Sequence, residues 1–286
     1  MKALVVEKPG PLASVQDLGR LGYARLGVSA GGAADRGALR LANRLVGNDA
    51  GAAGIEVTAG GFAARAEADL VVAVTGALGP VTIDGREVGT NAPLLWPSGA
   101  LAEVGMPVAG LRSYLGIAGG ITSPVVLGSR SYHALAGLGA PVAAGDRLPI
   151  GAELADLPVA DQAPVPPPSG THVTLELTGG PRRDWFTLEA LAGLGAADYV
   201  VTAELDRTGI RLDGPALARA DDRELASEGM VRGAVQVPAS GMPILFLADH
   251  PATGGYPVIG VLTERACDLA AQLTPGMHVR LRLVDR

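Results

Sequence analysis

The sequence is poor in residues that form disulfides or bind metals. It contains one cysteine, Cys267, and four histidines in 286 residues. With a single thiol no disulfide can form within the chain, which fits a reducing cytoplasm. The histidines stand far apart, and no pair has the spacing of a known metal-ligand motif, so we expect no bound metal. They are His133, His172, His250 and His278.

Positive charge and long apolar runs are also scarce. The chain has 23 Lys and Arg against 29 Asp and Glu, a net charge of −6, and no basic block. Because nucleic acids and anionic membranes are bound through clustered Lys and Arg, we expect neither as a partner. Gly, Pro or charge interrupts every apolar run well short of the roughly 18–20 residues that span a membrane. The apolar run in the opening MKALVVEKPG is too short for a signal peptide. We predict a soluble, cytoplasmic protein.

Several catalytic motifs are missing as well. No G-x-x-x-x-G-K-[ST] P-loop is present, and no G-x-G-x-x-G follows a strand pattern. The letters G-x-S-x-G occur once, at residues 27–31, but no strand pattern leads into them as it does in the turn that presents a nucleophilic serine. The sequence therefore gives no support to a P-loop nucleotidase, a dinucleotide-binding enzyme or a serine hydrolase of that type.

Glycine and proline, in contrast, are abundant, with 41 and 21 residues. Without a collagen-like period, such an excess indicates many turns and favours short strands over long helices. Apolar residues make up 48% of the chain, enough for a substantial core. The sequence therefore predicts a mainly β protein with a few short helices.

The proline-rich stretch PVPPPSG at 164–170 is the clearest punctuation, because successive prolines favour an extended chain. We predict a first domain over residues 1–155, a linker over 156–170 and a second domain over 171–286. The two halves show no convincing internal repeat.

Local signals locate individual elements. Residues 34–47 have leucines at helical spacing, and Asp35 is a suitable N-cap. Asp84-Gly85 between alternating residues predicts a hairpin with a type I′ turn. Residues 184–194 and 264–276 predict two further short helices, and 278–284 predicts a final strand.

Five glycine-rich turns carry one or two polar residues each. An ordinary β-turn explains any one of them, since Gly supplies positive φ and Asp or Ser binds the turn backbone. Five together favour a site, because such turns expose backbone N–H groups that hold an anion or an oxyanion. The turns are residues 16–23, 27–35, 127–131, 236–243 and 248–257.

Charged and polar residues in these turns are the candidate site. Arg20 and Arg130 would bind a carboxylate or phosphate through paired hydrogen bonds. Asp17 and Asp249 would orient or deprotonate a nitrogen or a water. Tyr256 would cover a flat ligand. We predict substrate contacts for Gln16, Ser129, Gln236, Ser240, Thr253, Gly254, Gly255 and Tyr256. An Arg20–Asp17 ion pair that only pins its loop is the alternative for the first turn.

Longer blocks of the sequence resemble the KipA / allophanate hydrolase subunit 2 family, in order and over almost the whole chain. The family includes one subunit of the ATP-dependent 5-oxoprolinase, and it is similar to the carboxyltransferase part of biotin-dependent urea carboxylase. In the first half the resembling blocks are QDLGRLGYARLGV, ALRLANRLVGN, RSYLGIAGG, VLGSRS and AGDRL. In the second half they are DRTGIRL, SEGMVRGAVQVPASGMPI and LADHPATGGYPVIGVLTERACDLAAQLTPGMHVR.

The resemblance implies two cyclophilin-like β-barrel domains and a multi-subunit enzyme. The implied partners are a KipI / allophanate hydrolase subunit 1-like protein and one further 5-oxoprolinase subunit. The implied activity is the ATP-dependent opening of the lactam of 5-oxoproline to glutamate. Arg20 or Arg130 would then hold the substrate carboxylate, amides at Gly254 and Gly255 the oxyanion, and Asp17 or Asp249 the proton.

Two other functions stay open. The chain would alternatively be the carboxyltransferase subunit of a biotin-dependent urea or amide carboxylase, with biotin and the carboxylase on other proteins. It would otherwise be a non-catalytic partner of a KipI-like kinase inhibitor. The sequence departs from the family pattern at Gly31–Asp35, at Ala252, and after LGSRS, where Leu135 stands in place of an Arg in a shorter loop.

Overall fold

The chain forms two compact units, each with its own hydrophobic core. The computed structural model describes residues 2–152, 162–165, 170–221 and 223–284. Residues 156–161 and 166–169 of the predicted linker lie outside the described residues, and the predicted domain boundaries stay a prediction. Among the described residues, no helix is both long and apolar enough to cross a membrane.

Each unit gathers segments that are separate in the sequence. The N-terminal unit comprises Met1–Arg20, Asp35–His133 and Gly137–Ser169. The C-terminal unit comprises Leu21–Ala34, Ala134–Ala136 and Gly170–Arg286. Two short segments from the first half of the sequence therefore belong to the C-terminal unit, and both contribute to the network around Asp249 described below.

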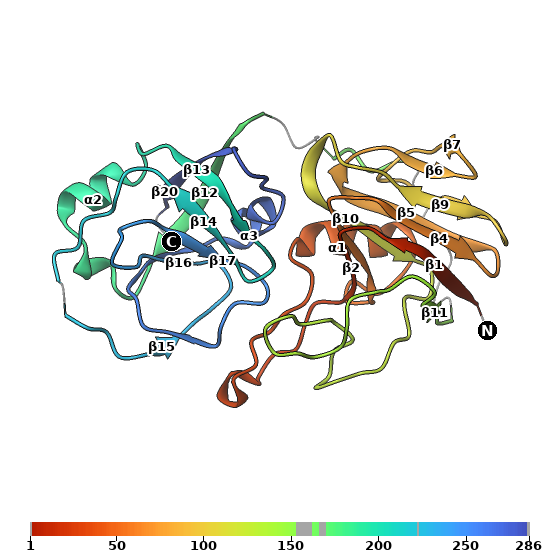
Figure 1. The fold of residues 1–286 in the computed structure, drawn as a ribbon, viewed down its shortest axis with the longest axis horizontal. Helices are drawn as coiled ribbons and strands as arrows, with labels where there is room; N and C mark the ends of the chain where they lie inside the picture. Colours follow the sequence, from red (N-terminus) through yellow and green to blue (C-terminus); the bar gives the residue numbers. More distant parts are fainter. Residues whose placement is uncertain (1, 153–161, 166–169, 222, 285–286) are drawn as a thin grey trace. The chain divides into compact units, whose positions relative to one another are not determined.

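Two sheets build the N-terminal unit (Figure 1). One has the strand order β11-β1-β4-β9-β6-β7 and the other β2-β3-β10-β5-β8. Their apolar faces share one core, because buried residues of both sheets, such as Leu4, Phe62, Ile55 and Leu115, belong to the same cluster. The strands are β1 (Ala3–Pro9), β2 (Leu12–Gln16), β3 (Gly54–Thr58), β4 (Phe62–Ala66), β5 (Leu70–Leu78), β6 (Val81–Ile83), β7 (Arg86–Glu87), β8 (Leu94–Trp96), β9 (Leu101–Val104), β10 (Ala109–Ile117) and β11 (Arg147–Pro149).

The helix of this unit, α1 (Arg36–Leu45), packs against β5 and β10. Asp35 caps it as predicted, since its side chain accepts a hydrogen bond from Ala38 N at 2.8 Å. Helix and strand approach closely at Gly116, where an added Cβ would lie 2.7 Å from the carbonyl carbon of Ala42. A larger residue at this glycine would push the helix off the sheet.

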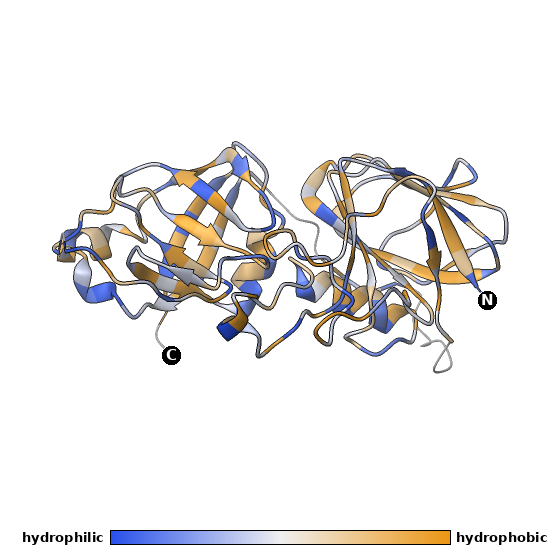
Figure 2. Ribbon diagram, turned by 60° about the horizontal axis from the view of Figure 1, so that its bottom comes forward, coloured by the Kyte–Doolittle hydropathy of each residue, from blue (hydrophilic) through white to orange (hydrophobic). Residues whose placement is uncertain are grey.

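The C-terminal unit contains a closed barrel of the strands β12-β19-β16-β17-β14-β13-β20. The pairs are antiparallel except for β12 and β20, which run parallel. Apolar and polar residues alternate along these strands, as the orange and blue segments in Figure 2 show. Buried apolar side chains of the strands form the core of this unit. The barrel strands are β12 (His172–Gly179), β13 (Tyr199–Leu205), β14 (Gly209–Asp213), β16 (Ala234–Gln236), β17 (Ile244–Phe246), β19 (Val258–Leu262) and β20 (His278–Leu283).

A small ribbon and two helices complete this unit. The ribbon pairs β15 (Glu228–Gly229) with β18 (Thr253–Gly254). The helices are α2 (Leu188–Gly193) and α3 (Glu264–Ala270), and 3-10 turns occupy Ala24–Leu26 and Arg183–Trp185. The mainly β prediction with few short helices is confirmed; that the units are cyclophilin-like stays a prediction.

Candidate functional site

Asp17 follows directly after β2 and is almost completely buried. Its Oδ1 accepts hydrogen bonds from Gly19 N at 2.7 Å, Ser129 Oγ at 2.7 Å and Ser131 Oγ at 2.6 Å. Its Oδ2 accepts one from Arg130 N at 2.7 Å. Four donors therefore stabilise one carboxylate charge, and the carboxylate holds the 127–131 turn against the end of β2.

The two predicted arginines of this unit differ in exposure. Arg20 is 2% exposed, and its guanidinium donates to the carbonyls of Val126, over 3.3 Å, and Ser131. Arg130 is partly exposed, and its Nη1 donates to Ser123 O. Arg20 thus holds the turn from inside, whereas Arg130 is partly exposed.

Gln16, the last residue of β2, is fully buried. Its Nε2 donates to Ser14 Oγ at 2.9 Å and to Tyr132 O at 3.1 Å. Its Oε1 accepts no hydrogen bond from any residue that the structure describes. A buried acceptor without a donor is costly, so this atom is a natural partner for an N–H group of a ligand.

A second buried polar group in the N-terminal unit joins β3, β10 and the start of α1. The Tyr114 hydroxyl donates to Glu56 Oε2 at 2.8 Å and accepts from Asp35 N at 2.7 Å. Arg112 lies 3.8 Å from Glu56 Oε1, and both side chains are 1% exposed. Burial, and then the charge of Glu56, raises the pKa of Tyr114 well above its ordinary value. The tyrosine therefore stays a neutral hydrogen-bond bridge.

In the C-terminal unit Asp249 forms a buried two-point ion pair with Arg207. Arg207 Nε lies 3.0 Å from Asp249 Oδ2 and Arg207 Nη2 lies 3.0 Å from Asp249 Oδ1. The side chains are 3% and 0% exposed. A pair so deeply buried is favourable only when further hydrogen bonds satisfy its remaining donors and acceptors.

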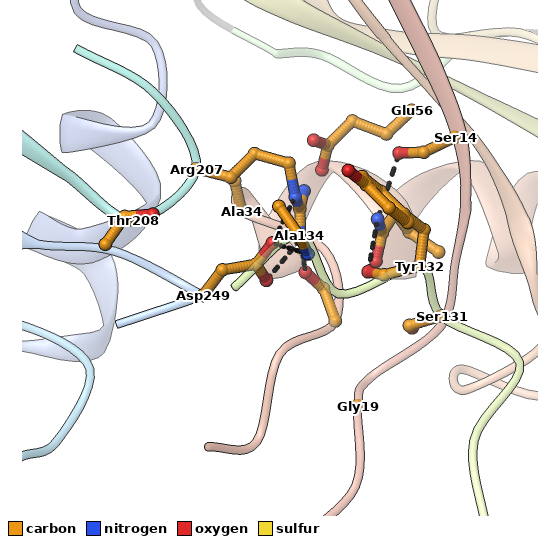
Figure 3. A network of polar contacts seen from close by, with 12 residues as sticks. Ser14, Gly19, Ala34, Glu56, Ser131, Tyr132, Ala134, Arg207, Thr208 and Asp249 are labelled. Carbon is orange, nitrogen blue, oxygen red and sulfur yellow. Dashed lines mark hydrogen bonds and ion pairs between the residues drawn. The ribbon is translucent and has the colours of Figure 1, made fainter. Parts of the chain in front are cut away.

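Those further bonds come from the two short segments of this unit. Arg207 Nη2 donates to Gly32 O at 2.6 Å, and Ala134 N donates to Asp249 Oδ2 at 3.0 Å. Figure 3 shows Arg207, Asp249 and Ala134 converging in this network. The ion pair therefore anchors two loops to the barrel.

Local backbone bonds explain why Arg207 points here. Arg207 lies in the tight turn between β13 and β14, which Asp206 closes by accepting from Thr208 N at 2.6 Å and Gly209 N at 3.0 Å. The turn is then bonded to the segment that follows β17, because Asp249 N donates to Arg207 O at 2.9 Å. Backbone and side chain thus fix the same pair of residues.

A third polar group surrounds Gln236 at the end of β16. Its Nε2 donates to Tyr256 O at 3.1 Å, and Gly254 lies directly beside it. A Cβ added to Gly254 would lie 2.5 Å from Gln236 Nε2 and 3.1 Å from Met230 Sδ. Only glycine allows this close approach, so the backbone of β18 covers the buried amide.

The remaining predicted residues lie at the surface of this unit. Ser240 is exposed in the turn between β16 and β17, where its Oγ accepts from Met242 N over 3.4 Å. Thr253 and Gly255 are exposed, and Tyr256 is 48% exposed. Their exposure leaves them accessible to a ligand.

The structure thus sorts the predicted residues into groups, and their catalytic and binding roles stay predictions. In the N-terminal unit one turn brings together Gln16, Asp17, Arg20, Ser129 and Arg130. In the C-terminal unit Asp249 joins Arg207, while Gln236, Gly254 and Tyr256 form a separate group.

A family model decides to which proteins this chain is related. The model for the carboxyltransferase domain, subdomains A and B, matches residues 26–283. The chain belongs to the carboxyltransferase domain family. The match includes most of both units and begins after β1 and β2.

Individual relatives carry two different names. The chain is 36% identical over 280 residues to the 5-oxoprolinase C subunit of Escherichia coli K12, covering 96% of this chain and 89% of the relative. It is 31% identical to urea amidolyase of Saccharomyces cerevisiae, covering 97% of this chain but only 16% of that protein. The crystal structure of TTHA0988 superimposes with a TM-score of 0.88 at 36% identity, covering 99% of this chain and 55% of the other. The resemblance to a 5-oxoprolinase subunit is confirmed.

Sequence reasoning missed several buried polar residues of this carboxyltransferase domain protein. Arg207 belongs to DRTGIRL, one of the blocks that resemble the family. A charged residue in the short turn between two predicted strands is the signal that could have identified it. Glu56 stands inside an otherwise apolar strand, and a charge at such a position predicts a buried partner. Which partner it meets depends on the strand register, and the register places it opposite Tyr114.

Proposed function

We propose that this chain is one component of an ATP-dependent 5-oxoprolinase complex that opens the lactam of 5-oxoproline to glutamate. The supporting observation is the 36% identity to the Escherichia coli 5-oxoprolinase subunit over nearly all of both chains. That relative is named as one subunit of an enzyme, and we infer activity only with two partners: a KipI / allophanate hydrolase subunit 1-like protein, and a third 5-oxoprolinase subunit. We place the complex in the cytoplasm, where Cys267 stays reduced.

In this proposal the N-terminal unit recognises the substrate. Arg130 is the cation for the carboxylate of 5-oxoproline, since this residue is partly exposed, whereas Arg20 is buried. Gln16 Oε1 accepts the lactam N–H, because it is an acceptor without a donor in the described structure. Ser129 and Asp17 hold the turn that carries Arg130 in place.

On the C-terminal unit, taken by itself, we propose a separate ligand-binding surface. The backbone N–H groups near Gly254 and Gly255 are the candidate donors to an oxyanion, and Tyr256 would cover a flat ligand. The buried Gln236 side chain holds this backbone in place, because it contacts Gly254 and donates to Tyr256 O. Ser240 and Thr253, both exposed, would line the approach.

Neither aspartate is free to act as a base without giving up protein contacts. Asp17 accepts four hydrogen bonds, and Asp249 accepts three. We therefore propose that both are positioning residues, as is Arg20, and that one of the partner proteins supplies the group that moves the proton. ATP is a substrate of the assembled complex in this proposal, and no residue of this chain is assigned to it.

Reconstitution tests the function directly. The chain is mixed with both partner proteins, ATP and 5-oxoproline, and glutamate is measured. We expect turnover only when all three proteins are present. Arg130→Ala should abolish turnover without changing the melting temperature. Arg147→Ala is the matched control, because Arg147 pairs with Glu67 at the surface of the same unit and should leave turnover unchanged. Full activity of Arg130→Ala would refute the site, and absence of glutamate with the intact chain would refute the function.

The carboxyltransferase reaction is the second candidate. It is favoured by the family model, whose description is a carboxyltransferase domain, and by the relationship to urea amidolyase. Biotin would then arrive on another protein. Transfer of labelled carboxylate from a carboxybiotinylated carrier protein to urea, without glutamate formation, would establish this alternative. A tight complex with the KipI-like protein and neither activity would indicate the regulatory role.

A further inference from the structure

Three potential metal ligands meet on the outside of the C-terminal barrel. His172 begins β12, His278 begins β20, and the two are direct partners in the parallel ladder. Asp198 immediately precedes β13, which pairs with β20 on its other side. The neighbouring Val279 of β20 is fully buried, so the histidines project from the opposite, outer face.

The side chains are close enough to share one ion. One ligand atom from each of the three residues lies within 4.8 Å of the other two. His278 Nδ1 lies 2.7 Å from Asp198 Oδ2, and the two imidazole rings stack with centroids 4.5 Å apart and planes inclined by 16°. Small side-chain rotations would bring the three atoms to the distances of a common coordination sphere.

Two features favour a ligand at these residues: a hydroxyl group beside His172, and a carboxylate oxygen of Asp198 that accepts no hydrogen bond from the described residues. Thr171 Oγ1 lies 3.1 Å from His172 Nδ1, which orients this ring. Asp198 Oδ1 is shielded from solvent, yet no residue that the structure places donates a hydrogen bond to it. The nearest cation is Arg280, whose Nε lies 3.9 Å from that oxygen, beyond hydrogen-bond distance.

We propose that His172, His278 and Asp198 form a binding site for Zn²⁺ or a similar divalent transition metal. Two imidazoles and one carboxylate are a donor set that Zn²⁺ accepts, with the fourth position left to water. The metal would lie between His278 Nδ1 and Asp198 Oδ2 and replace their direct contact, so that both atoms become ligands. This site is independent of the proposed lactam-opening function.

The position of the site gives the metal a structural role. It joins the starts of β12 and β20 to the start of β13, and thus ties three adjacent strands of the closed barrel. A metal that binds the folded chain and not the unfolded one raises the melting temperature, and the rise grows with its affinity. The site also lies where the chain enters the barrel, directly after residue 170.

Titration calorimetry with ZnCl₂ tests the site on the full chain without a histidine tag. We expect one Zn²⁺ per chain and a rise in melting temperature on adding metal. The double variant His172→Ala/His278→Ala should lose both effects. His133 and His250 remain in that variant; because both are buried, they should not substitute as ligands.

Arg280→Ala is the informative second variant. It removes the cation that competes for Asp198 and keeps all three ligands, so Zn²⁺ should bind more tightly than to the unchanged chain. If the three residues form only a surface ion-pair cluster, Zn²⁺ should bind neither to the unchanged chain nor to Arg280→Ala. No binding to the unchanged chain, binding that survives in the double variant, or weaker binding in Arg280→Ala would each overturn the proposal.

Discussion

At the scale of single residues, the buried charges of this chain are each held by several partners. Asp17 accepts four hydrogen bonds, and Asp249 pairs with Arg207 while also accepting from Ala134 N. Burial of a carboxylate costs several kcal/mol unless such partners compensate it. The sequence could indicate which turns carry polar residues, but the compensating partners come from distant segments.

Breaking the Arg207–Asp249 pair should strongly destabilise the C-terminal unit. Arg207→Ala and Asp249→Ala should each lower the free energy of unfolding by about 3–5 kcal/mol, because each leaves an uncompensated buried charge. The double variant should cost less than the sum of the two. Urea unfolding followed by circular dichroism measures this. Arg211→Ala, which removes an exposed ion pair with Glu204, should cost less than about 1 kcal/mol. If the double variant loses as much free energy of unfolding as the two single variants together, a direct interaction between the two residues is contradicted.

Two buried tyrosines should respond in opposite directions to the same substitution. Tyr114→Phe removes a hydroxyl bonded to Glu56 and Asp35, and should lower the free energy of unfolding by about 1–3 kcal/mol. The Tyr199 hydroxyl is buried, and the described residues offer it no hydrogen-bond partner. Tyr199→Phe should therefore be neutral or stabilising, by up to about 1 kcal/mol. Equal destabilisation in both variants, in parallel denaturant titrations, would refute this account.

At the scale of elements, the sequence could predict those features that depend on neighbouring residues alone. The cap of α1 at Asp35 and the turn at Asp84-Gly85 are confirmed. In that turn φ is 48° at Asp84 and 73° at Gly85, the positive values that a type I′ turn requires. Both features depend on residues within four positions of each other, so no knowledge of distant contacts is needed.

The ribbon of β15 and β18 offers a matched pair of glycines. Gly254→Ala would bring Cβ to 2.5 Å from Gln236 Nε2, and should distort β18 and the proposed oxyanion donors. Gly229→Ala meets no atom within 4 Å and should leave the ribbon intact. We expect Gly254→Ala to lower kcat of the reconstituted complex, with little effect from Gly229→Ala. Similar kinetics for the two variants would argue against a site at β18.

Strand pairing, in contrast, was not accessible from local patterns. His172 and His278 are neighbours only because β12 and β20 run parallel and close the barrel. Each strand is predicted by its alternation of apolar and polar residues, but alternation does not specify the partner or the register. The sequence therefore led to the expectation of no bound metal, whereas the structure supports the proposal of a site.

At the scale of the whole molecule, stability should depend on alkaline pH through the buried tyrosines. Burial raises the pKa of Tyr199 to about 12, above the ordinary value of 10.0 in the unfolded chain. Between these two values the unfolded chain loses the proton and the folded chain keeps it, so deprotonation favours unfolding. Tyr199 therefore adds no pH dependence to stability below pH 10, and the folded chain loses stability as the pH rises from 10 through 12.

Melting temperatures between pH 8 and 12 would measure this effect. The unchanged chain should lose stability above pH 10, and Tyr199→Phe should lose less over the same interval, because the titrating hydroxyl is gone. Absorption of tyrosinate in the folded chain should show delayed ionisation of Tyr199. Ionisation of Tyr199 near pH 10 in the folded chain would contradict its burial.

The sequence by itself determined the mainly β character, the caps and turns, and the family, because periodicity, turn chemistry and long matching blocks are local or ordered along the chain. Only the tertiary structure decided which polar residues meet: Arg207 with Asp249, Tyr114 with Glu56, and His172 with His278. These pairings follow from barrel closure and strand register. Closure and register result from the packing of the whole core, and no short stretch of sequence encodes that packing.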